Sequence, residues 1–283
     1  MSHFCVLVLG DNVDELLAPY DEDIRVAPRV SGEVTQEDKD EFIEIYTVYV
    51  SSKRSYGCTS ILEEEENKNL SFDELYSKYG ERWNDNSWVK QADGKWVEIT
   101  TYNPNSKWDW YQIGGRFAGR LFLKDGIKKE ENPNFSWGWS EEEIKKVINE
   151  PRVDSALMSE IDWDKLHLNQ EKYNKALHFW EMKVEGKEPI TEEDKEDLRW
   201  DNYKTTYYVA KYKNKETYAK AMSSFTVWAI LDKSGWEEKG EMGWFGMSSE
   251  TNDEGLEWEL NMYDKFIKDL PPNTRLTIVD CHI

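Results

Sequence analysis

The stretch WDWYQIGGRF, residues 108–117, combines aromatic rings, a double glycine and an arginine, which are residue types that nucleotide-binding loops use. A dinucleotide fingerprint needs a helix after its glycines, whereas GGRFAGRLFL continues into strand-like sequence, and no Gly-Lys-Ser/Thr follows. The pattern therefore favours a glycine bend between strands. We expect Trp108 and Trp110 on one face, and Arg116 stacked on a ring or paired with an acid. A ligand loop is the alternative.

A second glycine-rich stretch, GEMGWFGM at residues 240–247, also combines aromatics with methionines. Glycine permits a close approach and methionine adapts its shape, so the stretch can line a pocket or form a tight buried bend. We hypothesise that Glu241 pairs with Arg116 and joins both stretches in one site. The candidate ligand loop then comprises Trp108, Trp110, Gly114, Gly115, Arg116, Glu241 and Trp244.

Aromatic and acidic residues also cluster in the middle of the chain. NFSWGWSEEE (residues 134–143) places two tryptophans beside three glutamates, and YKTTYY (203–208) adds tyrosines. Aromatic anchors surrounded by charge are typical of protein interfaces. Alternatively, these rings fill a small core of their own. The candidate partner-binding residues are Trp137, Trp139, Glu141, Glu142, Glu143, Tyr207 and Tyr208.

The histidines and cysteines do not predict a catalytic or metal site. His3 and His282 lie in apolar runs at the two chain ends, and pairing of those runs would bring Asp280 and Cys281 near them. However, successive strand residues point to opposite faces, and no HxxxH or CxxC motif is present. Cys5 lies in an apolar strand, where burial raises the thiol pKa, and no G-x-S-x-G motif occurs. We therefore expect a non-enzyme without cofactor or metal.

Two apolar runs near the chain ends, FCVLVLG (4–10) and RLTIVDCHI (275–283), predict the elements that position these residues. Unbroken apolar character is typical of central strands covered on both faces, so we expect both strands in one sheet, as neighbours. The other expected elements outside the middle region are helices at 35–50, 71–80 and 255–270 and strands at 96–102, 120–123 and 225–231.

The middle region, residues 126–222, is highly charged and predominantly helical in pattern. Capping signals or helical periodicity indicate helices from Ser140, over 163–184 and from Thr191, whereas 203–212 has strand composition. The sequence thus predicts an α+β fold, with a mixed sheet core formed by both chain ends and a largely helical inserted lobe. The expected domains are 1–125 and 223–283 for the core and 126–222 for the acidic, aromatic lobe.

The charge balance restricts the partners. The chain has 36 basic and 57 acidic residues and a net charge of −21, which repels phosphate backbones and anionic lipids. No apolar run approaches the roughly 20 residues that span a bilayer, and three cysteines are too few for a disulfide framework. We therefore expect no direct nucleic-acid or membrane binding, and a cytoplasmic location.

Four segments occur in the same order as in a family of phage-encoded proteins, which the chain resembles over about 1–125 and 223–283. They are MSHFCVLVLG with LAPYDE, NPNSKWDWYQIGGRF, KGEMGWFGM and LTIVDCHI. A further resemblance is to phage proteins that inhibit the Gabija defence system, a nuclease and helicase complex. It implies a homo-oligomeric protein of the host cytoplasm that binds this complex and blocks its DNA binding or cleavage.

These observations lead to one main hypothesis and two alternatives. The main hypothesis is a non-enzymatic inhibitor of a host defence complex, since an acidic surface can bind the basic DNA-binding face of a nuclease. The first alternative is a sponge protein that sequesters a small nucleotide immune signal at the aromatic loops and Arg116. The second is a hydrolase that uses Glu241 with the terminal histidines.

Overall fold

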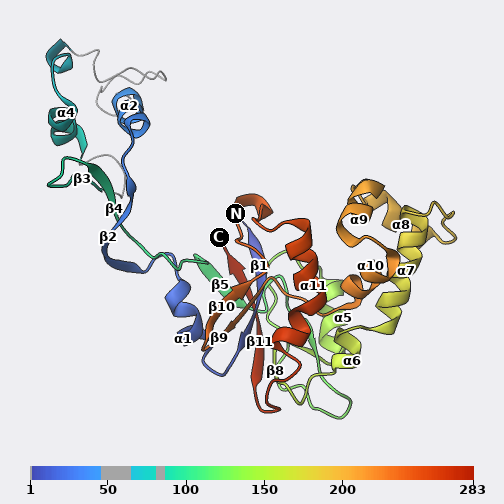
Figure 1. The fold of residues 1–283 in the computed structure, drawn as a ribbon. Helices are drawn as coiled ribbons and strands as arrows, with labels where there is room; N and C mark the ends of the chain where they lie inside the picture. Colours follow the sequence, from blue (N-terminus) through green and yellow to red (C-terminus); the bar gives the residue numbers. More distant parts are fainter. Residues whose placement is uncertain (1, 46–64, 81–86) are drawn as a thin grey trace. The chain divides into compact units, whose positions relative to one another are not determined.

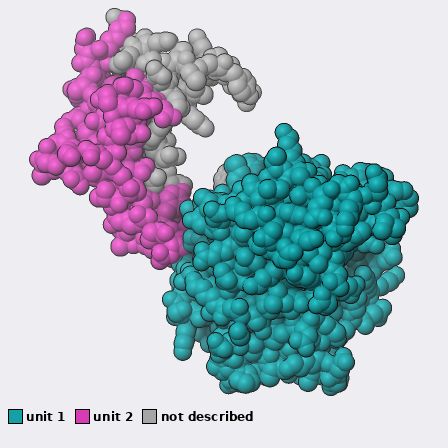
Figure 2. Space-filling model, turned by 45° about the vertical axis from the view of Figure 1, so that its right-hand side comes forward, with its two compact units in different colours: residues 1–21, 107–283 teal, residues 22–106 magenta. Residues whose placement is uncertain are grey.

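The computed structural model describes residues 2–45, 65–80 and 87–283 (Figure 1). The chain divides into two compact units, one formed by residues 1–21 with 107–283 and the other by residues 22–106 (Figure 2). The expected boundaries at 125 and 222 differ from these, because residues 22–106 form a unit of their own. Residues 126–222 belong to the same unit as both chain ends, and their independence as an inserted lobe stays a prediction.

The first unit is built on a six-stranded mixed sheet with the order β10-β9-β1-β11-β5, in which β8 also pairs with β11. The first strand, β1, pairs antiparallel with the last strand, β11, from His3 opposite His282 to Leu9 opposite Leu276, and β9 runs parallel to β1. The expected pairing of the two chain ends is confirmed. The strands are β1 His3–Leu9, β5 Trp110–Ile113, β8 Ser155–Leu157, β9 Ala229–Asp232, β10 Gly235–Glu238 and β11 Arg275–His282.

Both faces of this sheet are covered, as the unbroken apolar runs predict. Cys5 and Leu7 of β1 belong to a core cluster with Met262 of helix α11 (Asn252–Phe266). Val6 and Val8 point to the other face, where helix α1 (Val13–Leu17) packs. Alternate residues of one strand thus supply two hydrophobic cores.

Capping boxes begin several helices where the sequence indicates. The Ser140 side chain caps α5 (Glu141–Asn149) and the Thr191 side chain caps α8 (Glu192–Trp200), each with reciprocal hydrogen bonds to the residue three positions later. A further capping box at Thr251 begins α11 three residues before the expected start at 255, and the helix ends at Phe266 rather than 270.

The middle region contains further helices, and one of them forms where a strand was predicted. The segment with strand composition forms helix α9 (Thr205–Tyr212), because Tyr208 and Tyr212 pack into an aromatic core with Trp180 and Tyr218. Tertiary packing overrides the β propensity of this segment. The other elements of this region and its edges are β6 Leu121–Phe122, β7 Arg152–Val153, α6 Trp163–Leu166, α7 Gln170–Lys183 and α10 Lys215–Ser223.

The fold class is α+β, as predicted. The helices of the middle region have a core that includes Leu256 and Leu260 of α11, so α11 contributes to this core as well as to the sheet core. The predicted helix over 163–184 is interrupted, because Leu168 has a φ of 50° and Asn169 begins α7 as its N-cap. Figure 1 shows α7, α8, α9 and α10 grouped together in this unit.

The second unit is smaller and has its own aromatic core. Its antiparallel sheet has the order β2-β4-β3 and packs around Phe42, Leu75, Tyr79 and Trp88. The Ser71 capping box is confirmed. The expected helix over 35–50 forms α2, and its residues 46–50 lie outside the described residues. The elements are β2 Arg25–Glu33, α2 Gln36–Ile45, η3 Glu65–Asn67, α4 Phe72–Tyr79, β3 Ser87–Lys90 and β4 Trp96–Tyr102.

Candidate functional site

The double glycine after β5 forms a turn that packs against two carboxylates of the protein itself. Gly114 and Gly115 have φ angles of 75° and 60°, in the left-handed region that favours glycine. A Cβ on Gly115 would lie 2.5 Å from Asp280 Oδ2, and one on Gly114 would collide with the Asp154 carboxylate. The positions that a phosphate would take beside these glycines are therefore occupied.

Backbone N–H groups hold both carboxylates in place. Asp154 accepts hydrogen bonds from the N–H groups of Gly119 and Asn134, both at 2.6 Å. Burial raises the pKa of Asp154, and these two hydrogen bonds oppose that rise. Asp280 accepts from the Arg116 N–H at 2.9 Å. The expected glycine bend between strands is confirmed, because the turn lies between β5 (Trp110–Ile113) and β6 (Leu121–Phe122). The anions beside it are side chains of the protein itself.

The two tryptophans of this stretch do not share a face. Trp108 is buried in the core cluster that contains Cys281, and its Nε1 donates to the Leu17 carbonyl at 3.2 Å. Trp110 is exposed, and its ring lies 6.4 Å from that of His282. Since Cys281 and His282 point to opposite faces of β11, the tryptophans do too. The expectation that Trp108 and Trp110 share a face is wrong, because β5 begins only at Trp110 and Trp108 lies before the strand.

Arg116 lies next to Trp137 and Trp139, although the sequence predicted these residues in two different sites. The Arg116 guanidinium lies 5.4 Å from the centre of the Trp137 ring, so its expected stacking on an aromatic ring is confirmed. Trp139 donates from Nε1 to the Gly115 carbonyl at 3.1 Å. A surface cavity of about 380 Å³ is lined by Arg116, Trp137, Gly138, Trp139 and Glu143, a group named here the Trp137 patch.

Trp137 is the most exposed aromatic side chain in this patch. It is 83 % exposed, whereas Trp139 is half-buried. Glu141 and Glu142 are exposed in the first turn of α5, where their negative charges interact favourably with the helix dipole. Hydrogen bonds from Ser140 lower the pKa of Glu143. The patch thus combines an exposed indole, a cation and the carboxylate of Glu143, and the exposed Glu141 and Glu142 precede Glu143 in the same helix.

The two tyrosine candidates contribute less surface. Tyr208 is buried in the helical core, where its hydroxyl donates to Asp201 at 2.7 Å and burial raises its pKa. Tyr207 is half-buried and stacks on the exposed ring of Tyr203, with centroids 4.4 Å apart. Tyr208 is therefore a core residue, as the alternative interpretation of these rings predicted. The exposed ring in this segment is that of Tyr203.

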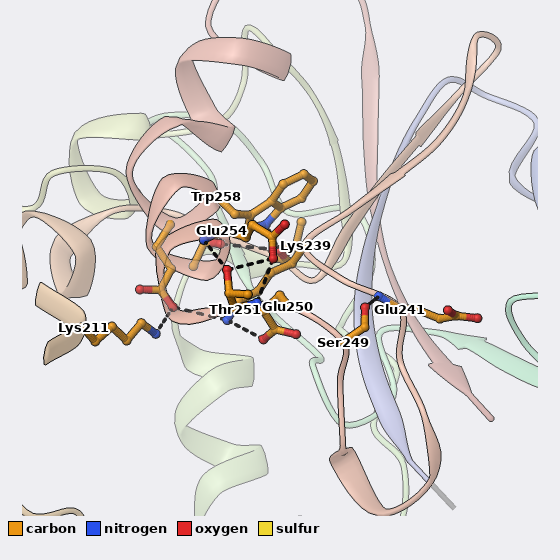
Figure 3. Close-up of polar contacts among 11 residues, drawn as sticks. Lys211, Lys239, Glu241, Ser249, Glu250, Thr251, Glu254 and Trp258 are labelled. Atoms are coloured by element: carbon orange, nitrogen blue, oxygen red, sulfur yellow. Dashed lines mark hydrogen bonds and ion pairs between the residues drawn. The ribbon is translucent and has the colours of Figure 1, made fainter. Parts of the chain in front are cut away.

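The expected ion pair between Arg116 and Glu241 does not form among the described residues. Glu241 follows β10, at one edge of the sheet, whereas Arg116 follows β5 at the opposite edge. The Glu241 N–H donates to Ser249 Oγ at 2.9 Å, and its exposed carboxylate points away from Lys239 (Figure 3). Trp244 begins the short 3-10 helix η5 (Trp244–Gly246). The two glycine-rich stretches thus do not build one site.

The terminal histidines each pair with an aspartate. His3 Nδ1 lies 2.8 Å from Asp280 Oδ1, and His282 Nδ1 lies 2.6 Å from Asp109 Oδ1. The two rings meet edge to face with centroids 4.9 Å apart. Within the described part of the chain, no three His, Cys, Asp or Glu side chains form a group that could hold a metal ion. These pairs instead connect β1, β11 and the turn before β5.

The buried cysteines lack the properties of catalytic nucleophiles. Burial raises the pKa of Cys5 to about 11 and that of Cys281 well above its ordinary value. At pH 8 only about one Cys5 thiol in a thousand is then ionised, and the ionised form is the reactive one. The expectation that Cys5 is inert is supported.

We predict that Ellman's reagent labels neither thiol in the native Cys58→Ser protein at pH 8. Cys58 lies outside the described residues, and its removal leaves Cys5 and Cys281 as the only thiols. The unfolded protein serves as the control and should react at both. Rapid labelling of one thiol in the native protein would contradict the inert assignment.

Other exposed aromatic side chains were not predicted. Trp200, at the end of α8, is 77 % exposed, and Phe245 in η5 is exposed with a left-handed φ of 58°. The Ser2 side chain holds this turn through hydrogen bonds with the Gly243 carbonyl and the Gly246 N–H, both at 2.7 Å. The clustering of aromatics with glycines in GEMGWFGM is the sequence pattern that could have predicted an exposed ring at Phe245.

No family model, curated protein or solved structure matches this chain. Within the described residues, no helix has both the length and the apolar character that a bilayer crossing requires.

Proposed function

We propose that this is a phage protein that binds and inhibits a bacterial anti-phage defence complex of the Gabija type, without catalysing a reaction. It acts in the host cytoplasm by protein–protein interaction and blocks DNA binding or cleavage by the nuclease and helicase. The middle region reaches the partner, and the α+β core mediates homo-oligomerisation. The four-segment resemblance to phage proteins supports this assignment.

The exposed ring of Trp137 is the observation that carries the proposal. A tryptophan that is 83 % exposed contributes little to the stability of the fold. When a partner covers the ring, however, much apolar surface is removed from water, and this favours binding. Arg116 lies against this ring and restricts its movement, which lowers the entropy cost of binding. Tryptophan and arginine are also the residue types most enriched at interface hot spots.

The charge of the protein supports a basic partner. The net charge of −21, together with the exposed Glu141 and Glu142 beside Trp137, creates a negative field that speeds association with a DNA-binding surface. The same field repels DNA itself, so the protein contacts the complex rather than its substrate.

The test is co-purification of the protein with a Gabija complex, combined with phage growth in cells that carry this system. The proposal expects a stable complex, inhibited DNA cleavage in vitro and restored phage growth. If neither binding nor rescue occurs, the Gabija assignment is wrong.

The Trp137→Ala variant should bind the defence complex about 30-fold more weakly, since truncation of a hot-spot residue costs about 2 kcal/mol or more. Its thermal stability should be unchanged, because the ring is almost fully exposed. Binding is measured by surface plasmon resonance and stability by thermal denaturation.

Trp200→Ala provides a matched control, because this ring is similarly exposed, at 77 %, but lies at the end of α8. Its affinity should stay within a few-fold of the unaltered protein. A loss confined to Trp200→Ala would move the interface away from the Trp137 patch.

The alternative proposal, a sponge for a small nucleotide signal at the double-glycine turn, has less support. The Asp154 and Asp280 carboxylates lie where the phosphates of such a ligand would have to approach these glycines. Calorimetry with cyclic nucleotides tests this alternative separately.

A further inference from the structure

A cavity of about 460 Å³ in the first unit has a basic lining, although the chain as a whole carries a charge of −21. Five cationic side chains and a single acidic one line it. They are Arg120, Arg152, Lys165, Lys172 and Lys175, with Glu171 as the acid. We name this the cationic cavity.

Three of these five cations already have a carboxylate partner. Arg152, Lys165 and Lys175 lie 2.5, 3.1 and 2.7 Å from carboxylate oxygens of Glu150, Asp162 and Glu193, respectively. Among the described residues, Arg120 and Lys172 form no ion pair. Within the described part of the chain, the cavity therefore contains two cations without an ion-pair partner, beside the single acid Glu171.

Burial and the neighbouring positive charges both act on the Lys172 ammonium. Partial burial of the Lys172 ammonium, together with the positive charges of Arg120 and Arg152, lowers the pKa of Lys172. A bound anion would reverse this effect, because it would be attracted to all three groups. A ligand of opposite charge would therefore reduce the electrostatic repulsion among these cations.

Aromatic rings and a backbone carbonyl orient the two guanidinium groups. Arg120 donates to the Thr226 carbonyl at 2.5 Å and lies 5.9 Å from the centre of the Phe225 ring. Arg152 lies 4.3 Å from the centre of the Phe122 ring. Fixed guanidinium planes lose less entropy when they form paired hydrogen bonds with an oxyanion.

We propose that the cationic cavity binds the phosphate group of a small phosphorylated molecule, of the class of a nucleoside monophosphate. Arg120 and Lys172, which form no ion pair, outnumber Glu171, the one acidic side chain of the lining among the described residues, and arginine forms paired hydrogen bonds with phosphate oxygens. The cavity volume is in the range of ordinary small-molecule sites and accommodates more than a free phosphate ion.

A small anion fits this cavity better than a nucleic acid does. A polyanion meets the repulsion of the whole acidic protein along its length, whereas a single phosphate experiences mainly the local field of the cavity. The inference is independent of the proposed defence inhibition, because it concerns a different surface from the Trp137 patch.

Isothermal titration calorimetry with AMP, inorganic phosphate and adenosine tests the proposal on the full-length protein. AMP and phosphate should bind and adenosine should not, and added salt should weaken the binding. The Lys172→Met and Arg120→Gln proteins should each bind AMP at least about tenfold more weakly. Lys175→Met is the matched control, because Glu193 and Asp197 already neutralise Lys175, and its affinity should change less than about threefold.

Several outcomes would overturn the proposal. These are no heat with AMP or phosphate, adenosine binding as tightly as AMP, and affinities unchanged in both the Lys172 and Arg120 variants. A short DNA duplex that bound through Arg120 and Lys172 more tightly than AMP would also overturn it. The Lys172 side chain is exposed overall and only its ammonium group is partly buried, so its variant should fold normally, and circular dichroism checks this. A protein that binds AMP but no defence complex would retain this site while losing the proposed function.

Discussion

The Lys211→Met protein should unfold with a free energy lower by about 3 kcal/mol, because the substitution breaks a buried ion pair. Lys211 Nζ, labelled in Figure 3, lies 2.8 Å from Glu259 Oε1. The side chains of Lys211 and Glu259 are only 9 % and 11 % exposed. Lys239 lies 3.3 Å from the same oxygen and compensates only in part. Glu259 Oε2 is buried without a hydrogen-bond partner among the described residues, so this carboxylate depends on its lysines.

The loss should not vary between pH 6 and pH 9. Burial disfavours the charge of Lys211, but the hydrogen bond and negative charge of Glu259 outweigh it and raise the pKa of Lys211 above its ordinary value. A raised lysine pKa contributes stability that is complete below the unfolded value of about 10.4 and is lost only at higher pH. Urea unfolding curves at several pH values measure this.

Two variants serve as controls for Lys211→Met. The Lys211→Met/Glu259→Met protein should recover at least half of the lost stability, because it removes the uncompensated Glu259 carboxylate while Lys239 keeps Glu250 at 3.5 Å. Lys145→Met removes a surface partner of Glu141, whose side chain is 92 % exposed, and should cost less than about 0.5 kcal/mol. A double variant less stable than the single one would contradict this account of the pair.

The Gly114→Ala protein should lose about 4 kcal/mol of stability, near the upper end of single-substitution effects. Gly114 has a φ of 75°, which costs an alanine roughly 1–2 kcal/mol. Its Cβ would also lie 2.7 Å from the Asn134 carbonyl oxygen and would collide with the Asp154 carboxylate. Asp154 cannot move away without losing its two backbone hydrogen bonds.

Gly126→Ala separates the cost of the left-handed backbone from the cost of the steric collision. Gly126 has a φ of 84°, but no heavy atom lies within 4 Å of its added Cβ, so this variant should cost only about 1 kcal/mol. Thermal denaturation should therefore rank Gly114→Ala well below Gly126→Ala. Equal stabilities would mean that the packing against Asp154 contributes nothing.

The two proposals place two different binding surfaces on the first unit, the Trp137 patch and the cationic cavity. The Trp137 patch presents an exposed ring among solvated carboxylates, which suits a basic macromolecule. The cationic cavity presents Arg120 and Lys172, which form no ion pair among the described residues and suit a small anion. A phosphorylated ligand in this cavity would change the charge of the first unit without occupying the patch.

The sequence by itself determined the features that depend on neighbouring residues. The apolar runs at the two ends predicted paired central strands, because a strand covered on both faces needs apolar residues at every position. The capping boxes at Ser71, Ser140 and Thr191 predicted helix starts, because a cap needs only residues three positions apart.

Only the tertiary structure decided the features that depend on distant segments. Asp154 and Asp280 reach the double glycine from two other strands or their edges, and this turned a candidate phosphate loop into an internal anion site. Arg120 and Lys172 are far apart in the sequence, so no local pattern predicts that they share a cavity. Glu241 and Arg116 fall at opposite edges of the sheet because the strand order separates β10 from β5. Local propensities cannot encode such distances, which arise when long-range pairing and packing place the strands and helices.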